Sequence, residues 1–251
     1  MQKLKFIIFS LVVLSGLVFL FSPGVAPDNF QFQEILNLVS QNDVVIIFNS
    51  GGWGNTPLEK AEDFAPIVEG IQQTLNDWGY NSVVIPFVRT KDNLSGKITG
   101  AKDFFNSFEF CSEVLAQKVE FLAEEFPDKK IIMAGLSAGG AFVDKTYEKI
   151  SEEVKGSVYT IVVGAPFWVK PIESENMLSL ENNGKDSLVK GDVKTLILTL
   201  LKTPFRWILA KINGQNLTFS QAFRVPGHNY DWSSPEVGPQ IVTFLKERFK
   251  N

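Results

Sequence analysis

The segment from Met133 to Phe142, MAGLSAGGAF, places a serine between glycines, and this serine is the first candidate for chemistry. Ser137 has Gly135 two residues before it and Gly139 two residues after it, which gives the pattern G-x-S-x-G. A serine hydroxyl is a weak nucleophile near neutral pH, so it needs a base within hydrogen-bond reach and a third group that orients the base. The motif is short, so its significance depends on whether the chain supplies those partners.

Histidine is the most common base beside such a serine, and the chain contains one histidine, His228. It lies in the segment FRVPGHNYDW, after an apolar extended stretch that predicts a strand. A C-terminal helix is expected to begin at Ser234-Pro235, so the histidine lies on the loop between the two elements. Because there is no second histidine, the hypothesis that Ser137 is a nucleophile requires His228 as its base.

The carboxylate that orients the imidazole is expected between Ser137 and His228 in the chain. In NMLSLENNGKDSLV the apolar residues predict a strand, Gly184 predicts a turn, and Asp186 follows that turn. A carboxylate there can hold the required imidazole tautomer and stabilise the imidazolium. Aspartate in such a position also caps turns, and Asp192 and Asp231 are alternative carboxylates.

Strands alternate with helices along most of the chain. Apolar, β-branched runs predict buried strands at 43–48, 81–87, 129–134 and 157–166, the last ending in a turn. Helices are expected from a capping box at Thr56 to Trp78, from Phe108 to Phe126, and from the glycine turn to Ile150, with a loop at 89–106 and either a helix or a packing strap at 30–39. Such alternation predicts a parallel sheet covered on both faces, with ligand sites at the carboxyl ends of its strands. Ser137 falls at one of those ends.

The order of these elements resembles the α/β-hydrolase fold over residues 43–251. In that family G-x-S-x-G is the nucleophile elbow and the chain order is serine, acid, histidine, which Ser137, Asp186 and His228 keep. The resemblance implies an α/β fold with a mostly parallel sheet and a serine hydrolase that cleaves a carboxylic ester, like esterases and lipases. It implies a small-molecule or lipid acyl ester as substrate and no metal or organic cofactor.

The resemblance also implies an oxyanion hole. The backbone N–H of Ala138 would be one donor, and the loop NSGGWGN would supply the second from Gly52 or Trp53. The family often has a histidine before the glycines of this loop, and this chain has none there. Tyr230 and Trp232 are expected to line an apolar substrate pocket.

A segment between the expected acid and the histidine, residues 193–217, is expected to form a cap or lid. Its stretch VKTLILTLLKTPFRWILAKI contains four cations and no carboxylate. Lys202, Pro204 and Arg206 argue against a membrane span. Two interpretations remain, namely a helical cap with a buried apolar side or a basic amphipathic surface that rests on anionic lipid.

The N-terminus differs in composition from the rest of the chain. Lys3 and Lys5 precede the uncharged apolar run Phe6–Phe21, which predicts a signal anchor or a cleaved signal peptide within residues 1–27. The next cation is Lys60, so the positive-inside rule predicts that the domain 28–251 lies outside the cytoplasm, anchored to the membrane or secreted.

The overall composition limits the other function classes. The net charge of −4 and the pI of about 5.2 argue against a nucleic-acid-binding protein. Cys111 is the single cysteine, so an internal disulfide is excluded. Alternatives to the hydrolase are an inactive binding module of the same fold, an acyltransferase with the same machinery, and a membrane-tethered structural module in which the motif is accidental.

Overall fold

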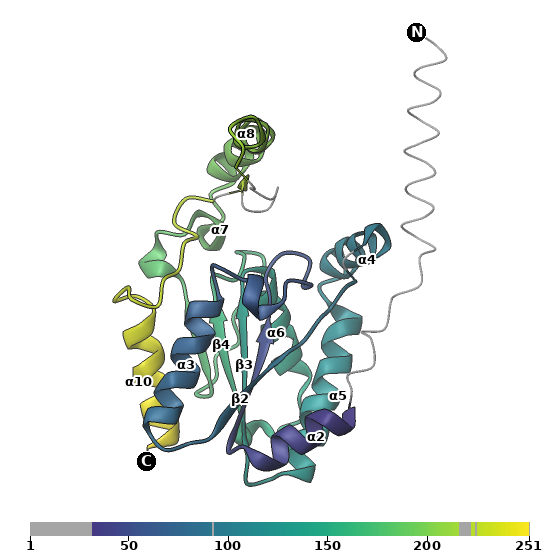
Figure 1. Ribbon diagram of the computed structural model, residues 1–251, viewed down its shortest axis with the longest axis vertical. Helices are drawn as coiled ribbons and strands as arrows, with labels where there is room; N and C mark the ends of the chain where they lie inside the picture. The colour runs from purple at the N-terminus through teal and green to yellow at the C-terminus, as the bar shows by residue number, and fades with distance from the viewer. Residues whose placement is uncertain (1–31, 92, 216–221, 224, 251) are drawn as a thin grey trace.

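A five-stranded parallel sheet forms the centre of the protein in the computed structural model, which describes residues 32–91, 93–215, 222–223 and 225–250 (Figure 1). The strand order is β2-β1-β3-β4-β5. The strands are β1 (Val44–Asn49), β2 (Ser82–Pro86), β3 (Lys130–Leu136), β4 (Val158–Val163) and β5 (Met177–Leu180). The predicted α/β class with a parallel sheet is confirmed.

Helices cover both faces of the sheet, because its central strands are apolar on both sides (Figure 1). On one face, Val45 and Ile47 pack with α5 (Glu109–Glu125) and α6 (Ala138–Lys149). On the other face, Val44 and Ile46 pack with α3 (Ala65–Asp77) and α10 (Gly238–Phe249). Alternation of side chains along each strand thus divides the core into two clusters.

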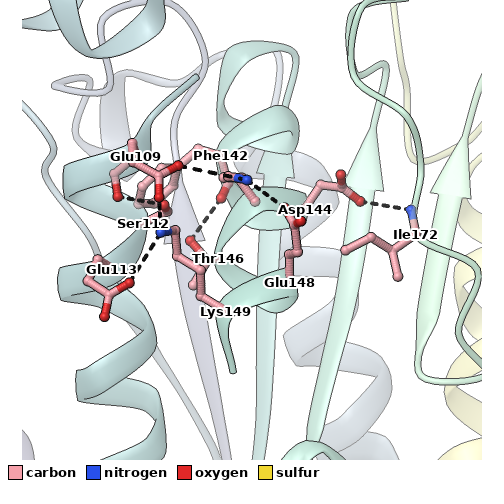
Figure 2. A network of polar contacts seen from close by, with 10 residues as sticks. Glu109, Ser112, Glu113, Phe142, Asp144, Thr146, Glu148, Lys149 and Ile172 are labelled. Atoms are coloured by element: carbon pink, nitrogen blue, oxygen red, sulfur yellow. Dashed lines mark hydrogen bonds and ion pairs between the residues drawn. The ribbon is translucent and has the colours of Figure 1, made fainter. Parts of the chain in front are cut away.

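Polar contacts join α5 to α6 and tie α6 to the segment before β5 (Figure 2). The Lys149 ammonium forms ion pairs with Glu109 and Glu113 of α5. On the other side of α6, the buried carboxylate of Asp144 accepts a hydrogen bond from the N–H of Ile172 at 3.2 Å. These contacts fix the orientation of α6, the helix whose first turn follows Ser137.

Several predicted boundaries differ from the structure. The capping box at Thr56 does not start a long helix; it is followed by the 3-10 turn η1 (Leu58–Lys60), and α3 begins at Ala65 with Pro66 in its first turn. Residues 89–106 were expected as a loop, but they contain α4 (Leu94–Phe105), whose N-cap Asn93 accepts from the N–H of Gly96. Of residues 30–39, the described ones belong to the helix α2 (Phe32–Gln41).

No strand forms in the described residues of the stretch before His228, where one was expected; residues 216–221 and 224 lie outside the described part. Among the described residues between β5 and α10, the chain forms turns and helices, including η3 (Asn182–Gly184), α7 (Ser187–Lys190) and α8 (Val193–Ile212). The C-terminal helix begins at Gly238 rather than at Ser234. The sheet ends at β5, so the histidine reaches the site from a loop with no strand directly before it in the described part.

Within the expected cap, residues 193–217, the chain forms one long helix, α8 (Val193–Ile212), at the end of the molecule beyond the sheet (Figure 1). Its apolar side chains are mostly exposed, which contradicts a cap with a buried apolar side. The expected anchor or signal segment, residues 1–27, lies outside the described residues. Within the described part of the chain, no helix meets the length and hydropathy needed to cross a membrane.

The strand order places a topological switch point between β1 and β3. The chain leaves β1 toward β2 at one edge, then returns to β3 on the other side of β1 and continues outward to β5. In doubly wound sheets ligands bind in the crevice at the carboxyl ends of the strands beside such a reversal. The segments that follow β1 and β3 at this place are the loop from Ser50 to Gly54 and Ser137.

Candidate active site

Ser137 lies on a sharp turn between β3 and α6 with a backbone conformation that side chains rarely adopt. Its φ is 56° and its ψ is −119°, and it is the N-cap residue of α6. Serine usually caps a helix with its hydroxyl, but this side chain forms no capping hydrogen bond. Because a strained backbone of this kind costs about 1–3 kcal/mol, it points to a functional constraint on the residue.

The glycines around Ser137 allow the turn to be tight. A Cβ added at Gly135 would collide with the carbonyl oxygen of Gly139, one turn further along the chain. A Cβ added at Gly139 would collide with the carbonyl oxygen of Asn49 at the end of β1. The first turn of α6 can therefore lie directly against the ends of β1 and β3, with its N–H groups close to Ser137.

Asp186 and His228 form a direct contact, as the sequence predicted. The Oδ2 atom of Asp186 lies 2.7 Å from the Nδ1 atom of His228. Asp186 is fully buried, and the histidine side chain is 15% exposed. The other oxygen, Oδ1, accepts from the N–H of Leu188 at 2.8 Å, so the carboxylate also caps α7. The capping role and the contact with the histidine are thus combined in one side chain.

Tyr230 is the third partner of this carboxylate. Its hydroxyl donates to Oδ2 of Asp186 at 2.7 Å, and its side chain is buried. Tyr230 was expected in a substrate pocket, but the structure places its polar end on Asp186. The ring of His228 meets the ring of Tyr230 edge to face, with centroids 5.7 Å apart. Tyr230 therefore holds both the acid and the base in place.

The hydrogen bonds keep Asp186 ionised in spite of its burial. Burial raises the pKa of Asp186, but the hydrogen bonds from His228, Tyr230 and the N–H of Leu188 outweigh it and hold the pKa below its usual value. For Tyr230, burial and then the bond to Asp186 raise the pKa well above its ordinary range, so the phenol keeps its proton. The arrangement thus provides a negative charge behind the imidazole at neutral pH.

The end of β4 links Ser137 to His228. The N–H of Ser137 donates to the carbonyl of Val163 at 2.8 Å. At the next residue, Gly164, an added Cβ would lie 2.9 Å from Cε1 of His228 and 2.9 Å from the hydroxyl of Tyr230. Consecutive residues of β4 and its turn therefore contact the serine backbone and the imidazole. Because Nδ1 of His228 faces Asp186, Nε2 is the nitrogen that remains for a substrate or for Ser137.

The loop after β1 approaches Ser137 from the other side. A Cβ added at Gly51 would lie 3.7 Å from Cβ of Ser137. Gly52 has a φ of 55° and Gly54 a φ of 71°, values that favour glycine. The N–H of Gly54 donates to the carbonyl of Gly51 and closes the turn at 3.1 Å. The donors expected at Gly52 and Trp53 lie in this turn, directly after the residue that touches Ser137.

Arg89 holds this loop in place through hydrogen bonds to its carbonyls, and this role was not predicted from the sequence. Its Nη2 atom donates to the carbonyl of Ser50 at 3.0 Å and to that of Gly52 at 3.4 Å. Its own N–H donates to the carbonyl of Gly54 at 2.8 Å. The next side chain, Thr90, donates its hydroxyl to the carbonyl of Trp53 at 2.7 Å. Arg89 and Thr90 thus hold four of the five backbone carbonyls of residues 50–54, all except that of Gly51.

The guanidinium of Arg89 is buried between two aromatic rings. Its Cζ atom lies 4.9 Å from the ring centroid of Phe108 and 5.0 Å from that of Phe142. Burial lowers the pKa of Arg89 to about 10, opposed by the charge of Asp103. Arg89 remains cationic at neutral pH and cannot leave its place without exposing both rings. In the sequence, Arg89 is one cation at the start of a stretch expected to be a loop, and no local pattern there indicates that it holds the loop after β1.

The other predicted residues lie elsewhere or have other partners. Trp232 packs against α3, where an added Cβ at Gly70 would collide with its ring, so the structure does not bring it to the site. Asp192 accepts from Thr195 at the start of α8, and Asp231 accepts from Ser233. The ring of Trp53 is 45% exposed beside the loop. Within the described residues, no group of three or more His, Cys, Asp or Glu side chains is arranged to hold a metal ion.

Comparisons with known proteins find limited similarity. No family model matches the chain, and no curated protein matches it in sequence. Among solved structures, a Trichoderma reesei cutinase in complex with a C11Y4 phosphonate inhibitor is similar with a TM-score of 0.48 and 15% identity over 71% of this chain and 84% of that one. An acetylxylan esterase is similar with a TM-score of 0.37 and 13% identity over 54% of this chain and 80% of that one. At these values neither neighbour carries an argument about this chain, and the argument about activity comes from the site itself.

Proposed function

We propose that this protein is a serine hydrolase that cleaves carboxylic esters, with Ser137 as nucleophile, His228 as base and Asp186 as the acid that orients it. Two observations support the proposal, namely the 2.7 Å contact between Asp186 and His228 and the positive φ of Ser137, whose N–H bonds to the same end of β4 that contacts the imidazole. A strained serine and a buried carboxylate–histidine pair lie at the same end of one sheet. They match the requirements of an activated hydroxyl nucleophile.

In this proposal the reaction has two steps. The Ser137 hydroxyl attacks the ester carbonyl while Nε2 of His228 takes its proton, and the imidazolium then protonates the leaving alcohol. A water molecule next attacks the acyl-enzyme with His228 again as base, which releases the carboxylic acid and restores the serine. Asp186 stays ionised throughout, because its hydrogen bonds already hold its pKa below its usual value.

The negative charge that develops on the carbonyl oxygen needs N–H donors. We assign one to Ala138, the first residue of α6, and the second to Gly52 or Trp53 in the loop that Arg89 holds. Donors fixed in advance stabilise this charge without reorganisation, and loss of one such donor typically lowers kcat by ~10²–10³-fold. Arg89 is a positioning residue in this scheme, because it acts through the loop.

The substrate class is proposed from exposed side chains near the site, and the location is proposed from the N-terminal sequence. A small-molecule or lipid acyl ester is the substrate class that suits the exposed aromatic and apolar side chains at this end of the protein, among them Trp53, Phe167 and Trp168. From the N-terminal sequence we propose a domain outside the cytoplasm, anchored through residues 1–27 or secreted after their removal.

The proposal is tested by hydrolysis of p-nitrophenyl esters of increasing acyl length by the full chain. We expect turnover that is lost in Ser137→Ala and His228→Ala and kept in Ser151→Ala, a matched control at the other end of α6. Turnover that Ser137→Ala retains would refute the assignment. Rapid acylation followed by slow release, accelerated by an added alcohol, would instead identify an acyltransferase, and a folded protein without acylation would identify a binding module.

A further inference from the structure

The outer surface of α8 is apolar, which is the reverse of the usual arrangement in a surface helix. Residues spaced three or four apart, Leu201, Phe205, Ile208 and Ile212, are between 48% and 74% exposed. The side chains that α8 buries are small or polar, namely Thr199, Thr203 and Ala210. A helix whose fully buried side chains are two threonines and an alanine, and whose leucine, isoleucine and phenylalanine side chains are mostly exposed, offers a surface for contact with something outside the chain described here.

Cations flank this apolar surface. Lys194, Lys202, Arg206 and Lys211 all belong to α8, and the helix contains no aspartate or glutamate. The chain as a whole carries a net charge of −4, so this helix is a local positive region on an acidic protein. With 3.6 residues per turn, Lys202 and Arg206 fall along one side of the row formed by Leu198, Leu201 and Phe205. The cations of α8 therefore favour a partner that is apolar where it meets the exposed row and negatively charged beside it.

The exposed apolar surface reaches the site end of the sheet through the residues before α8. The ring of Phe167 packs on Gly191, in the turn between α7 and α8. The backbone N–H of Phe167 donates to the carbonyl of Leu188. Trp168 lies beside Phe167 with ring centroids 5.0 Å apart, and the two side chains are 50% and 46% exposed. Tryptophan with neighbouring lysines and arginines is the composition typical of membrane–water interfaces.

We propose that α8 docks on a lipid bilayer that contains anionic lipid, lying in the plane of the surface with Leu201 and Phe205 turned into it. Lys202 and Arg206 lie in the middle of the helix. Their long side chains let the charged groups stay among the lipid headgroups while the apolar side chains enter the bilayer. A second copy of α8 as occupant is disfavoured, since a two-fold pair would bring cations of the same sign together. This inference concerns binding and does not depend on the proposed ester hydrolysis.

The test places a fluorophore on the helix in the full chain. Leu201→Cys, labelled with an environment-sensitive dye, is reconstituted with vesicles of phosphatidylcholine alone or with phosphatidylglycerol mixed in. The native Cys111 is buried, and burial raises the pKa of its thiol to about 12, so it competes poorly for the label. Gln117→Cys, labelled at an exposed position on α5, is the matched control. It reports any proximity to the membrane that the N-terminal segment alone causes.

We expect a blue shift at position 201 with quenching by spin-labelled lipid in the anionic vesicles, and neither at position 117. Each of Lys202→Gln and Arg206→Gln should lower the ratio of docked to undocked helix about five-fold, because a cation near an anionic surface contributes about 1 kcal/mol. Lys246→Gln in α10 should leave the ratio unchanged.

Three results would overturn the proposal. The first is an absence of quenching at position 201 in anionic vesicles. The second is equal quenching in neutral vesicles and in the two cation variants, which would show an apolar contact without charge selection. The third is a blue shift that lipid does not quench and that grows with the protein-to-lipid ratio, which would show that a second copy covers the helix. None of these readouts uses catalysis, so they are separate from a failure of the ester assay.

Discussion

Replacing Tyr230 with phenylalanine tests how the acid of the site is held. The substitution removes one hydroxyl and keeps the ring that packs on His228. That hydroxyl donates at 2.7 Å to an ionised carboxylate, and both partners are at most 5% exposed. A buried hydrogen bond to a charged group contributes about 1.5–3 kcal/mol to stability. Because Asp186 keeps its bonds from His228 and Leu188, we expect a loss of about 2 kcal/mol in the free energy of unfolding near neutral pH.

The effect of Tyr230→Phe on stability should depend on pH in a defined direction. The folded pKa of Asp186 lies below its unfolded value, so its stabilisation is present above the unfolded pKa and is lost as the pH falls through the folded pKa. The loss caused by Tyr230→Phe should therefore be largest near neutral pH and should shrink under acid conditions. Activity should fall by less than about ten-fold, because the bond that orients His228 remains.

The assay is urea unfolding at several pH values, together with ester turnover. Tyr147→Phe is the matched control, because the Tyr147 hydroxyl is also buried but contacts a neutral partner, Ser174, at 2.9 Å. That variant should lose about 1 kcal/mol, with little dependence on the ionisation of Asp186. A Tyr230→Phe variant within about 0.5 kcal/mol of the native protein at neutral pH, the range of surface substitutions, would refute the account of the carboxylate.

Three further predictions concern Asp186, Arg89 and the buried Asp144 of α6. Asp186→Asn should lower kcat by about 10⁴-fold, because an amide favours the wrong imidazole tautomer; turnover of the folded variant near the native rate would speak against the triad. Arg89→Leu should lower kcat by about 10²-fold with KM nearly unchanged, since the loop behind Gly52 loses its support, and Arg89→Lys should recover part of it in steady-state kinetics; a change in KM alone would contradict a positioning role. Burial raises the pKa of Asp144 to about 6, so its contribution to stability declines as the pH rises from about 4 to about 6 and stays lower above that. Asp144→Asn should remove this decline and raise the free energy of unfolding at neutral pH by up to about 3 kcal/mol in urea titrations; no gain at neutral pH would show that the native carboxylate is not penalised.

Much of the fold was predictable from local patterns. Strands such as Val44–Asn49 and Val158–Val163 are short β-branched runs buried on both faces, and their hydrophobicity is strong enough to fix the element type. The contact between Asp186 and His228 was predictable because the chain has one histidine and a carboxylate after a turn in the right order.

Other features depend on contacts that no local pattern encodes. The helix Leu94–Phe105 forms in a segment with glycines and polar residues, where the cap at Asn93 and packing on α5 override a weak propensity. Arg89 and Tyr230 acquire their roles from partners distant in sequence, at Ser50 and Asp186. The exposure of α8 could not be read from its composition, because an apolar helix is expected to be buried until the fold shows which side faces the protein.

The central claim is that Ser137 is an activated nucleophile. The most direct measurement is reaction of the folded full chain with a fluorophosphonate, followed by mass spectrometry of the peptide that carries Ser137. The account predicts one adduct, on Ser137, which is absent in Ser137→Ala and strongly reduced in His228→Ala, while Ser151→Ala reacts like the native protein. A folded protein that forms no adduct, or one that reacts equally well without His228, would contradict it.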